Sequence, residues 1–389
     1  MNRVFKVGRH ELVLQKNGTH YFPRLCADID AARQSVYLET YIFAADETGR
    51  LLSQALQRAA IRKVSVHVLL DGFGSADLPQ VWVDEMSNAG VDVQWFRREI
   101  SPFTLRPNRL RRLRRMHRKL AVIDGEIAYI SGINIINDIP ANEDFDAPRL
   151  DYAVRVKGRI AMEVQETMLH LWQKVKWVSL RKRIGRLRAR LRGTPKKIGG
   201  ANIELLVRDN FRHRHDIEHA YMQAIEQAQH EIIFANAYFL PGRALRQALK
   251  DAAKRGVRVV LLLQGKVEYL LQHYATLALY GQLLDAGIEI YEYRDSYLHA
   301  KVGVVDGAWA TVGSSNLEPF SLLLALEANL VVRDEGFAGA LRNSLLRAIA
   351  EGGEKVERKN LNGFSLLLAR ISYFFIRALV GMLGLSNKR

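Results

Sequence analysis

The sequence predicts an α/β protein of two tandem α/β/α domains, each with a mixed, mainly parallel sheet, related to each other by a pseudo-twofold axis. Two observations support this prediction. One order of strands and helices occurs twice, over residues 31–72 and again over residues 225–265. Each half then reaches the same string, in which a histidine is followed by a lysine two positions later and by an aspartate seven positions later. The alternation of strand and helix favours parallel pairing, because parallel neighbours are joined through a crossover helix.

The individual elements follow from hydrophobic periodicity and from the turn residues between them. In the first half, after a helical stretch that ends near Gln34, we expect a strand at 35–43, a helix at 51–62, a strand at 64–70, a helix around 80–89 and a short strand at 91–96. In the second half we expect the same elements at 231–239, 243–255, 257–263, 269–286 and 288–293. With 389 residues, 48% of them hydrophobic, the chain is long enough for two cores.

Each His-x-Lys string is expected to be a buried strand that turns back in a hairpin. Strong turn dipeptides follow the two strings, Asp124-Gly125 in the first half and Asp306-Gly307 in the second. The returning strands are expected at 127–131 and 308–313. Because side chains alternate along a strand, histidine and lysine would point to the same face. Two roles remain open for the aspartates, shaping the turn and taking a direct part in catalysis.

The paired side chains suit chemistry at a phosphodiester. His117 and Lys119 in the first half correspond to His299 and Lys301 in the second. One histidine can act as the nucleophile and the other as the proton donor, while the two lysines hold an anion between them. Such a site needs both halves of the chain, so we expect it at the interface of the two domains.

Two asparagines and two acids recur after the hairpins. Asn134 and Asn316 end stretches rich in glycine and serine, where backbone amides, the side-chain amide and Ser314 can approach phosphate oxygens. Asp151 and Glu327 each open a later apolar strand. A histidine that transfers protons needs a partner that fixes its tautomer, so these two acids are the candidates for orienting the histidines. The alternative is that each is an ordinary acid at the start of a strand.

The two copies of His-x-Lys-x4-Asp with a following Asn resemble the phospholipase D superfamily. Within it, the chain is similar to the bacterial cardiolipin synthases of the B type over about residues 10 to 350. The similarity rests on Tyr41-Ile-Phe with Asp46, Leu70-Asp-Gly-Phe-Gly-Ser75, Arg115-Met-His-Arg-Lys119, Asp151-Tyr-Ala-Val-Arg155, Ala235-Asn-Ala-Tyr-Phe239 and Ala310-Thr-Val-Gly-Ser-Ser-Asn-Leu317. One departure is Ser131-Gly132 in the first copy, where Gly-Gly or Gly-Ser is commoner; backbone amides remain in place there.

This resemblance implies a phosphatidyltransferase that converts two molecules of phosphatidylglycerol into cardiolipin and glycerol. It implies His117 as the nucleophile, oriented by Glu327, and His299 as the acid and base, oriented by Asp151. Lys119, Lys301, Asn134, Asn316 and Ser314 would bind the phosphate. No cofactor is implied, and the sequence shows no cysteine pair or carboxylate cluster at metal-ligand spacing, so no metal is expected.

The charge predicts an anionic partner. The formal net charge is +16 and the isoelectric point is near 9.9. Arginines alternate with aliphatic residues in two runs, 106–118 and 181–197, which suits an anionic lipid surface better than nucleic acid. Cys26 is the single cysteine, and the first residues show no apolar signal segment. We therefore expect a peripheral protein on the cytoplasmic face of a bacterial inner membrane, with no nucleic-acid partner.

The domain boundaries are expected as follows: a phospholipase D-like domain at 1–175, a basic linker at 176–200, a second such domain at 201–355, and an amphipathic membrane-associating helix at 356–389. For the last segment, lying in the plane of a membrane, spanning it and packing on the protein all remain open, because Arg370 and Arg377 interrupt its apolar residues.

Three other functions are compatible with the motifs. A hydrolytic phospholipase D would use the same histidines with water as the acceptor. A nuclease of the superfamily would suit the positive charge, but the aliphatic interleaving counts against it. A non-catalytic lipid-binding scaffold is disfavoured by the intact histidine and lysine in both copies. The acceptor alcohol and the oligomeric state are not determined by the sequence.

Overall fold

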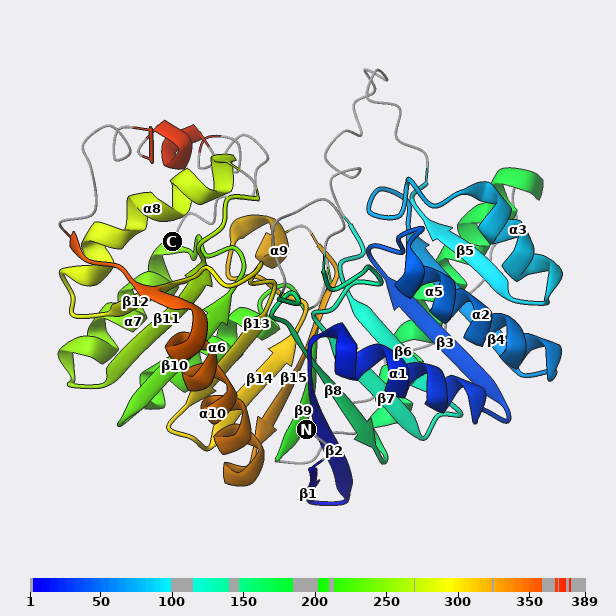
Figure 1. Cartoon of the computed structure of the whole chain (residues 1–389), viewed down its shortest axis with the longest axis horizontal. Coiled ribbons are helices and arrows are strands. Elements are labelled where there is room, and N and C mark those ends of the chain that lie inside the picture. Colours follow the sequence, from blue (N-terminus) through cyan, green and yellow to red (C-terminus); the bar gives the residue numbers. More distant parts are fainter. Residues whose placement is uncertain are drawn as a thin grey trace. The chain divides into compact units, whose positions relative to one another are not determined.

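The computed structural model describes residues 3–98, 115–139, 147–184, 202–209, 213–268, 270–323, 325–358, 368–369, 371–375 and 378. The chain divides into two units. The first comprises Met1–Asp138 and Ala153–Leu205, and the second comprises Ile139–Tyr152 and Leu206–Arg389. Each contains a mixed sheet of eight strands with helices on its faces (Figure 1), so the prediction of two tandem α/β/α domains is confirmed.

The first sheet combines a parallel part and an antiparallel part. Its strands, in the order in which they lie, are β1 (Val4–Val7), β2 (His10–Lys16), β8 (Tyr152–Lys157), β7 (Ile127–Ser131), β6 (Lys119–Ile123), β3 (Ser35–Thr40), β4 (Ser65–Asp71) and β5 (Asp92–Phe96). The run β3, β4, β5 is parallel, whereas β6 pairs antiparallel with both β3 and β7.

The second sheet repeats this arrangement. Its strands lie in the order β16 (Gly353–Lys355), β12 (Glu289–Tyr293), β11 (Arg258–Gln264), β10 (Glu231–Asn236), β13 (Lys301–Val305), β14 (Trp309–Gly313), β15 (Glu327–Arg333) and β9 (Ile203–Arg208). Strands β10, β11 and β12 are parallel, and β13 pairs antiparallel with β10 and β14.

One part of the fold prediction is wrong, because the sheets are mixed but not mainly parallel. Parallel pairing is confined to three strands in each sheet, and the remaining pairings that are described are antiparallel. The reason is that each hairpin places two antiparallel strands next to the parallel run, and β8 or β15 then continues the meander.

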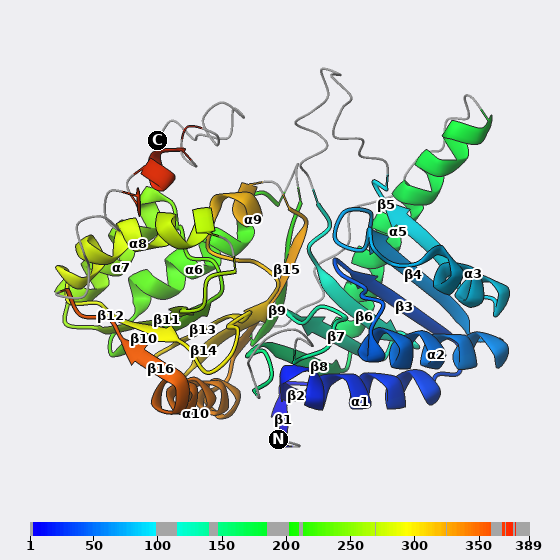
Figure 2. The ribbon, with the colours of Figure 1, turned by 45° about the horizontal axis from the view of Figure 1, so that its top comes forward.

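Helices cover both faces of the first sheet. On one face lie α1 (Asn17–Asp30), α2 (Glu47–Ile61) and α3 (Gln80–Asn88), whose apolar sides join Val36, Val68 and other strand residues in one core. The other face carries α5 (Ile160–Ile184), which contacts β3, β5, β6 and β7 (Figure 2). Helix α2 begins at an N-cap, Asp46, whose side chain accepts a hydrogen bond from the backbone N–H of Gly49.

The second sheet is covered in the same way. Helices α6 (Asp216–Gln227), α7 (Arg243–Lys254) and α8 (Leu270–Leu284) form one core with the sheet, and α10 (Glu335–Gly352) packs on the opposite face (Figure 2). A short helix, α9 (Pro319–Leu323), precedes β15. Each element expected at 231–293 is present, with ends that differ from the prediction by a few residues.

Several expected segments lie wholly or partly outside the described residues. These include most of the basic run at 106–118, residues 185–197 of the second basic run, and most of the segment 356–389. Helix α5 is continuous to Ile184, through the beginning of the expected linker at 176–200, so the linker boundaries stay a prediction. Within the described part of the chain, no helix has both the length and the apolar character needed to cross a membrane.

Candidate active site

The two hairpins place each histidine just before a strand. Strand β6 begins at Lys119 and β13 begins at Lys301, so His117 and His299 precede them instead of lying within them as predicted. The lysine ammonium groups turn back toward these histidines. Lys119 Nζ donates to the backbone oxygen of His117 at 2.7 Å, and Lys301 Nζ donates to the backbone oxygen of His299.

At the other end of the hairpin strands, Asp124 and Asp306 hold the backbone. Both have positive φ angles, 52° and 50°, and the following glycines continue the turn with φ of 69° and 64°. The Asp124 carboxylate accepts hydrogen bonds from the N–H groups of Arg33, Gln34 and Ser35 at 2.9, 2.7 and 2.9 Å. Asp306 accepts the equivalent three bonds from residues 229–231.

Of the two roles that the sequence left open for these aspartates, the structure shows the backbone role. Four strand residues separate Asp124 from Lys119, and the carboxylate already serves three donors. Partial burial opposes ionisation of Asp124, but the backbone hydrogen bonds outweigh it and lower the pKa of the carboxyl group. The same balance lowers the pKa of Asp306. A direct part of Asp124 and Asp306 in catalysis stays a prediction.

His117 contacts an aromatic ring, and the residue before it is hydrogen-bonded to the end of a strand. The ring of Tyr41 meets that of His117 edge to face, with centroids 4.9 Å apart, and Lys119 Nζ lies 5.3 Å from the centre of the same tyrosine ring. The residue before the histidine is held as well, because Asp71 Oδ2, at the end of β4, accepts a hydrogen bond from Met116 N at 2.8 Å.

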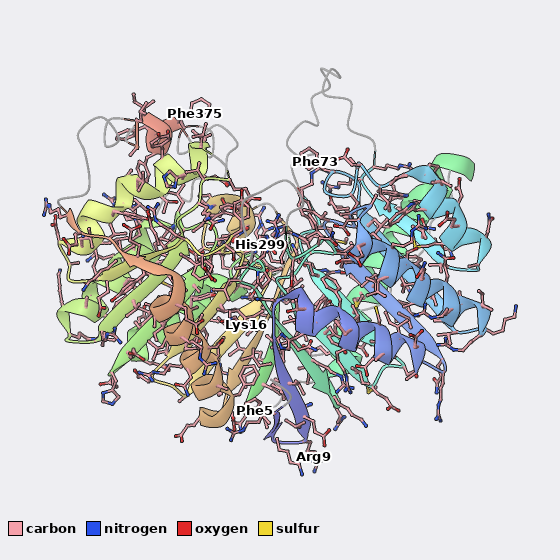
Figure 3. All side chains as sticks on the ribbon, in the orientation of Figure 1. Phe5, Arg9, Lys16, Phe73, His299 and Phe375 are labelled. Carbon is pink, nitrogen blue, oxygen red and sulfur yellow. The ribbon has the colours of Figure 1, made fainter. Side chains whose placement is uncertain are left out.

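His299, labelled in Figure 3, is paired with a buried carboxylate. Its Nδ1 lies 2.6 Å from Oδ2 of Asp151, a residue that is 3% exposed. The backbone of Leu150 bonds to both neighbours of Leu298: Leu150 N donates to Tyr297 O at 2.8 Å, and His299 N donates to Leu150 O at 2.9 Å. This contact is the one expected between Asp151 and His299; that it orients the ring for catalysis stays a prediction.

Lys301 is a strongly perturbed base. Its side chain is fully buried, and its Nζ lies 2.8 Å from His299 Nδ1 and 4.0 Å from Asp151 Oδ2. Since Nδ1 has one bonding position, it either donates to Asp151 or accepts from Lys301, and the charged carboxylate is the stronger partner. Desolvation lowers the pKa of Lys301 from 10.5 to about 8, although the negative charges of Asp151, Glu327 and Glu268 act in the opposite direction.

The two asparagines occupy matching positions. The residue after Asn134 bonds to the backbone beyond β3, with Ile135 N donating to Ile42 O and Ala44 N donating to Ile135 O. After Asn316, Leu317 O accepts from Leu240 N, and Asn236 Oδ1 accepts from Leu317 N at 2.9 Å. Both asparagines are buried, and among the described residues their Oδ1 atoms have no hydrogen-bond partner. The predicted binding of phosphate by the amide nitrogens stays a prediction.

Ser314 and Glu327 are bonded to each other. Ser314 Oγ donates to Glu327 Oε2 at 2.5 Å and accepts from Ala328 N at 3.0 Å, and neither residue is exposed. Ser314 therefore positions the glutamate, and its predicted role in binding phosphate stays a prediction. Glu327 and His117 belong to different units, so their pairing also stays a prediction.

The comparisons with known proteins agree with the duplicated hairpins. A family model described as "Cardiolipin synthase, PLD-like domain" matches residues 25–172 and 221–349. The chain belongs to this cardiolipin synthase family. It is 38% identical to the cardiolipin synthase B of Shigella flexneri over 386 residues, covering 98% of this chain and 92% of that protein. The cardiolipin synthase B of Escherichia coli (strain K12) gives the same values.

More distant matches extend over both halves of the chain. The major cardiolipin synthase of Bacillus subtilis (strain 168) is 31% identical over 319 residues, which is 82% of this chain and 64% of that protein. Among solved structures, a phosphatidylserine synthase of Haemophilus influenzae Rd KW20 has a TM-score of 0.68, with 15% identity and coverage of 96% and 94% of the two chains. At 15% identity this likeness shows a shared fold alone. The matched region covers both eight-stranded sheets of this chain.

In this cardiolipin synthase family member, sequence reasoning missed the residues that hold the chain before each histidine. Asp71 does this for Met116, and Gln264, at the end of β11, does it for Leu298, whose N–H donates to Gln264 Oε1 at 2.9 Å. The two positions match in the repeat, but one is a carboxylate and the other an amide. A search for identical residues in the two halves therefore does not find this pair of positions. What the two residues share is their place as the last residue of the second parallel strand, in β4 and in β11.

A buried ion pair beside the first motif was also missed. Arg118 donates to both carboxylate oxygens of Glu39, at 2.7 and 2.9 Å, and both residues are buried. Burial raises the pKa of Glu39, and the charge and hydrogen bonds of Arg118 oppose this. The second half has Ala300 in the place of Arg118. Among the described residues, no group of three or more His, Cys, Asp and Glu side chains is placed to hold a metal ion.

Proposed function

We propose that this protein is a cardiolipin synthase that transfers a phosphatidyl group from one phosphatidylglycerol to another, releasing glycerol. The observation that carries the proposal is the buried Asp151 carboxylate 2.6 Å from His299, at the start of a hairpin that the first half repeats around His117. The relatives that are 38% identical over 98% of the chain are named cardiolipin synthases, which supports this activity.

The first step breaks the bond between phosphorus and the glycerol oxygen. A ring nitrogen of His117 attacks phosphorus, and a phosphatidyl-histidine forms as the glycerol oxygen departs. Protonated His299 gives its proton from Nε2 to that oxygen, so that neutral glycerol leaves. Asp151 stabilises the imidazolium before the transfer and keeps the proton on Nδ1 after it.

The second step reverses the roles at His299. Neutral His299 takes the proton from the primary hydroxyl of a second phosphatidylglycerol. The freed oxygen attacks phosphorus, the bond from phosphorus to His117 breaks, and cardiolipin forms. The proton given up in the first step is thereby recovered, and the enzyme returns to its starting state. The proposal requires both imidazoles to reach one phosphorus atom.

Charge on the phosphorane oxygens would be balanced by Lys119, Lys301 and the amide groups of Asn134 and Asn316. Both lysines are buried, at 2% and 0% exposure, where an ammonium group acts more strongly on a neighbouring anion than it would in water. By analogy with donors of oxyanion holes, the loss of one such group costs about 3 kcal/mol of transition-state stabilisation.

We further propose a peripheral association with the cytoplasmic face of a membrane that contains phosphatidylglycerol. Exposed apolar side chains support it. In the segment 371–375, Tyr373 packs against the second core and its hydroxyl accepts a hydrogen bond from Arg246, whereas Ile371, Phe374 and Phe375 are 58%, 66% and 56% exposed (Figure 3 labels Phe375). The net charge of +16 adds attraction to anionic lipid.

The activity is tested by mass spectrometry of the lipids after incubation with phosphatidylglycerol alone. The proposal predicts cardiolipin and glycerol in equal amounts. Phosphatidic acid as the main product would instead identify a hydrolytic phospholipase D, and unchanged lipid would point to a binding protein. In the same assay His117→Ala and His299→Ala should each abolish the product, with circular dichroism to confirm that both variants are folded.

A further inference from the structure

A polar pocket in the second unit lies at the carboxyl end of β11 and the beginning of α8. The polar groups that line it include Gln264, Lys266, Glu268, Gln272, His273 and Tyr280. Gln264 connects this pocket to the candidate active site. Its side chain accepts a hydrogen bond from the N–H of Leu298, the residue immediately before His299. The wall of the pocket and the segment that carries the proton-transferring histidine therefore share one side chain.

Gln264 presents an unsatisfied donor to this pocket. The residue is 9% exposed, and while its Oε1 is bonded to Leu298 N, its Nε2 is buried without a partner in the described part of the chain. Buried polar groups of this kind are rare in proteins, since an unmade hydrogen bond costs stability. Such a group is retained more readily where it serves a ligand.

Gln272, one turn into α8, supplies the complementary group. Its Oε1 is buried and is likewise without a hydrogen-bond partner among the described residues. The pocket thus offers both a donor and an acceptor. Next to Gln272, burial lowers the pKa of His273, so its imidazole is neutral at pH 7 and can accept or donate one hydrogen bond.

The pocket is lined by one charge of each sign, Lys266 and Glu268, which suits a neutral polar molecule better than a phosphate group. Glu268, whose Oε2 accepts from the Tyr238 hydroxyl at 2.7 Å, would repel an anion but accept a hydrogen bond from an alcohol. Glu268 is also close enough to Lys301 for its charge to act on the pKa of that ammonium group. A neutral molecule with several hydroxyl groups satisfies a donor, an acceptor and a carboxylate together, because each hydroxyl both donates and accepts.

We propose that this pocket binds the glycerol moiety that reacts beside His299, either as the head group of phosphatidylglycerol or as free glycerol, with Gln264 and Gln272 as its hydroxyl ligands. This inference rests on the proposed transferase activity and adds the site of the reacting alcohol. It also gives Gln264 two functions, since one end of the amide holds the histidine segment and the other contacts the substrate.

The test is exchange of labelled glycerol into phosphatidylglycerol. Free glycerol replaces the lipid as the acceptor: its hydroxyl proton passes to His299, its oxygen bonds to phosphorus, and the bond from phosphorus to His117 breaks. Two variants remove one ligand each. Gln272→Leu removes the acceptor, and Gln264→Glu replaces the donor nitrogen while keeping an oxygen for Leu298 N. Gln247→Leu, an exposed position on α7, is the matched control.

We expect the KM for glycerol to rise about tenfold in both variants and to stay unchanged in the control. In Gln272→Leu kcat should stay within about threefold of the parent, whereas kcat of Gln264→Glu can also fall because Gln264 holds the segment before His299. The KM for 1-propanol, which has no second hydroxyl, should stay the same in all variants. If the KM for phosphatidylglycerol as the acceptor rises by the same factor, the pocket binds the lipid head group. If only the KM for free glycerol rises, the pocket binds the departing alcohol.

An unchanged glycerol KM in both variants, or an equal rise for 1-propanol, would overturn the assignment of the pocket. Failure of the proposed function looks different. In that case the unmodified protein neither exchanges glycerol nor makes cardiolipin, whatever the variants do, and the assignment falls with it. Among the described residues, Gln272 has no hydrogen bond to the histidine segment, so Gln272→Leu remains informative if Gln264→Glu disturbs folding.

Discussion

His299 Nδ1 and Asp151 Oδ2 lie 2.6 Å apart although 148 positions separate the two residues in the chain. The acid reaches the histidine because the segment 147–152 belongs to the second unit, and Leu150 forms a parallel bridge with Leu298. A residue that follows the first hairpin in the chain thus contacts the histidine of the second hairpin. The bridge holds the backbone immediately before each of the two residues.

Asp151→Asn should lower kcat about a thousandfold while the protein stays folded. Asparagine can still accept the hydrogen bond from Tyr152 N, which Asp151 Oδ1 accepts at 2.8 Å, but its amide would face His299 and favour the wrong tautomer. Steady-state kinetics on phosphatidylglycerol measures this. Asp251→Asn, at an exposed position of α7, is the control. Activity within tenfold of the parent in Asp151→Asn would remove the orienting role.

The pH dependence should report the buried ammonium group of Lys301. With its pKa lowered to about 8 by desolvation, the charged form that binds phosphate is lost as the pH rises through that value. We expect kcat/KM to fall above about pH 8. In Lys301→Arg, which stays charged, the residual activity should lack this decline. A decline at the same pH in Lys301→Arg would assign it to another group.

The free energy of unfolding should also change as Lys301 titrates, but it should rise with pH where kcat/KM falls. Between about pH 8 and 10.5 the unfolded chain binds a proton at Lys301 that the folded protein does not, so this group makes the free energy of unfolding rise with pH over that window. Urea unfolding of the parent and of Lys301→Met at pH 7.5 and pH 10 isolates the contribution. A fall in the parent relative to Lys301→Met would contradict the lowered pKa.

Asp124→Ala should destabilise the protein by about 1 to 3 kcal/mol and leave kcat per folded molecule nearly unchanged. Three backbone donors lose their acceptor, whereas no group at His117 is altered. Since the pKa of Asp124 is lowered from 3.8, its contribution is present above that pH and disappears as the pH falls through the folded value. Asp306→Ala should behave alike. A loss of activity comparable with that of His117→Ala would instead show that Asp124 takes a direct part in catalysis.

Association with lipid should depend on the exposed aromatic residues of 371–375. Phe374→Ser with Phe375→Ser should reduce sedimentation with vesicles containing phosphatidylglycerol about tenfold or more, because two exposed apolar side chains are lost. Activity on detergent-dispersed lipid should change little. Tyr373→Phe, which keeps the ring in the core, is the control. Equal losses in both assays would show that the segment is part of the fold.

The sequence predicted those features that depend on neighbouring residues. The two hairpins follow from Asp-Gly dipeptides with positive φ, and the order of strands and helices follows from apolar runs of the right length. The pairing of β6 against β3 was not predicted, because a hairpin pattern says nothing about which strand of the sheet it will meet. This long-range pairing adds one antiparallel pair in each sheet to those formed by the hairpins and the strands that follow them.

The sequence predicted a side-chain contact where the chemistry of one residue requires a particular kind of partner. It did not predict contacts that depend on which distant segments the fold brings together. Asp151 was identified because a histidine needs an acid. The partners of Asp124 lie 89 to 91 positions away, so its sequence context could not show that the carboxylate is already engaged. Ser314 stands in a motif typical of phosphate binding, yet its hydroxyl is directed at Glu327.

The most direct test of the two-histidine scheme is mass spectrometry of the protein itself, stopped in neutral detergent during turnover of phosphatidylglycerol and then digested. The scheme predicts a phosphatidyl group on the imidazole of His117 that disappears once the lipid is consumed. Continued formation of cardiolipin with His117 unmodified at every time point would contradict it.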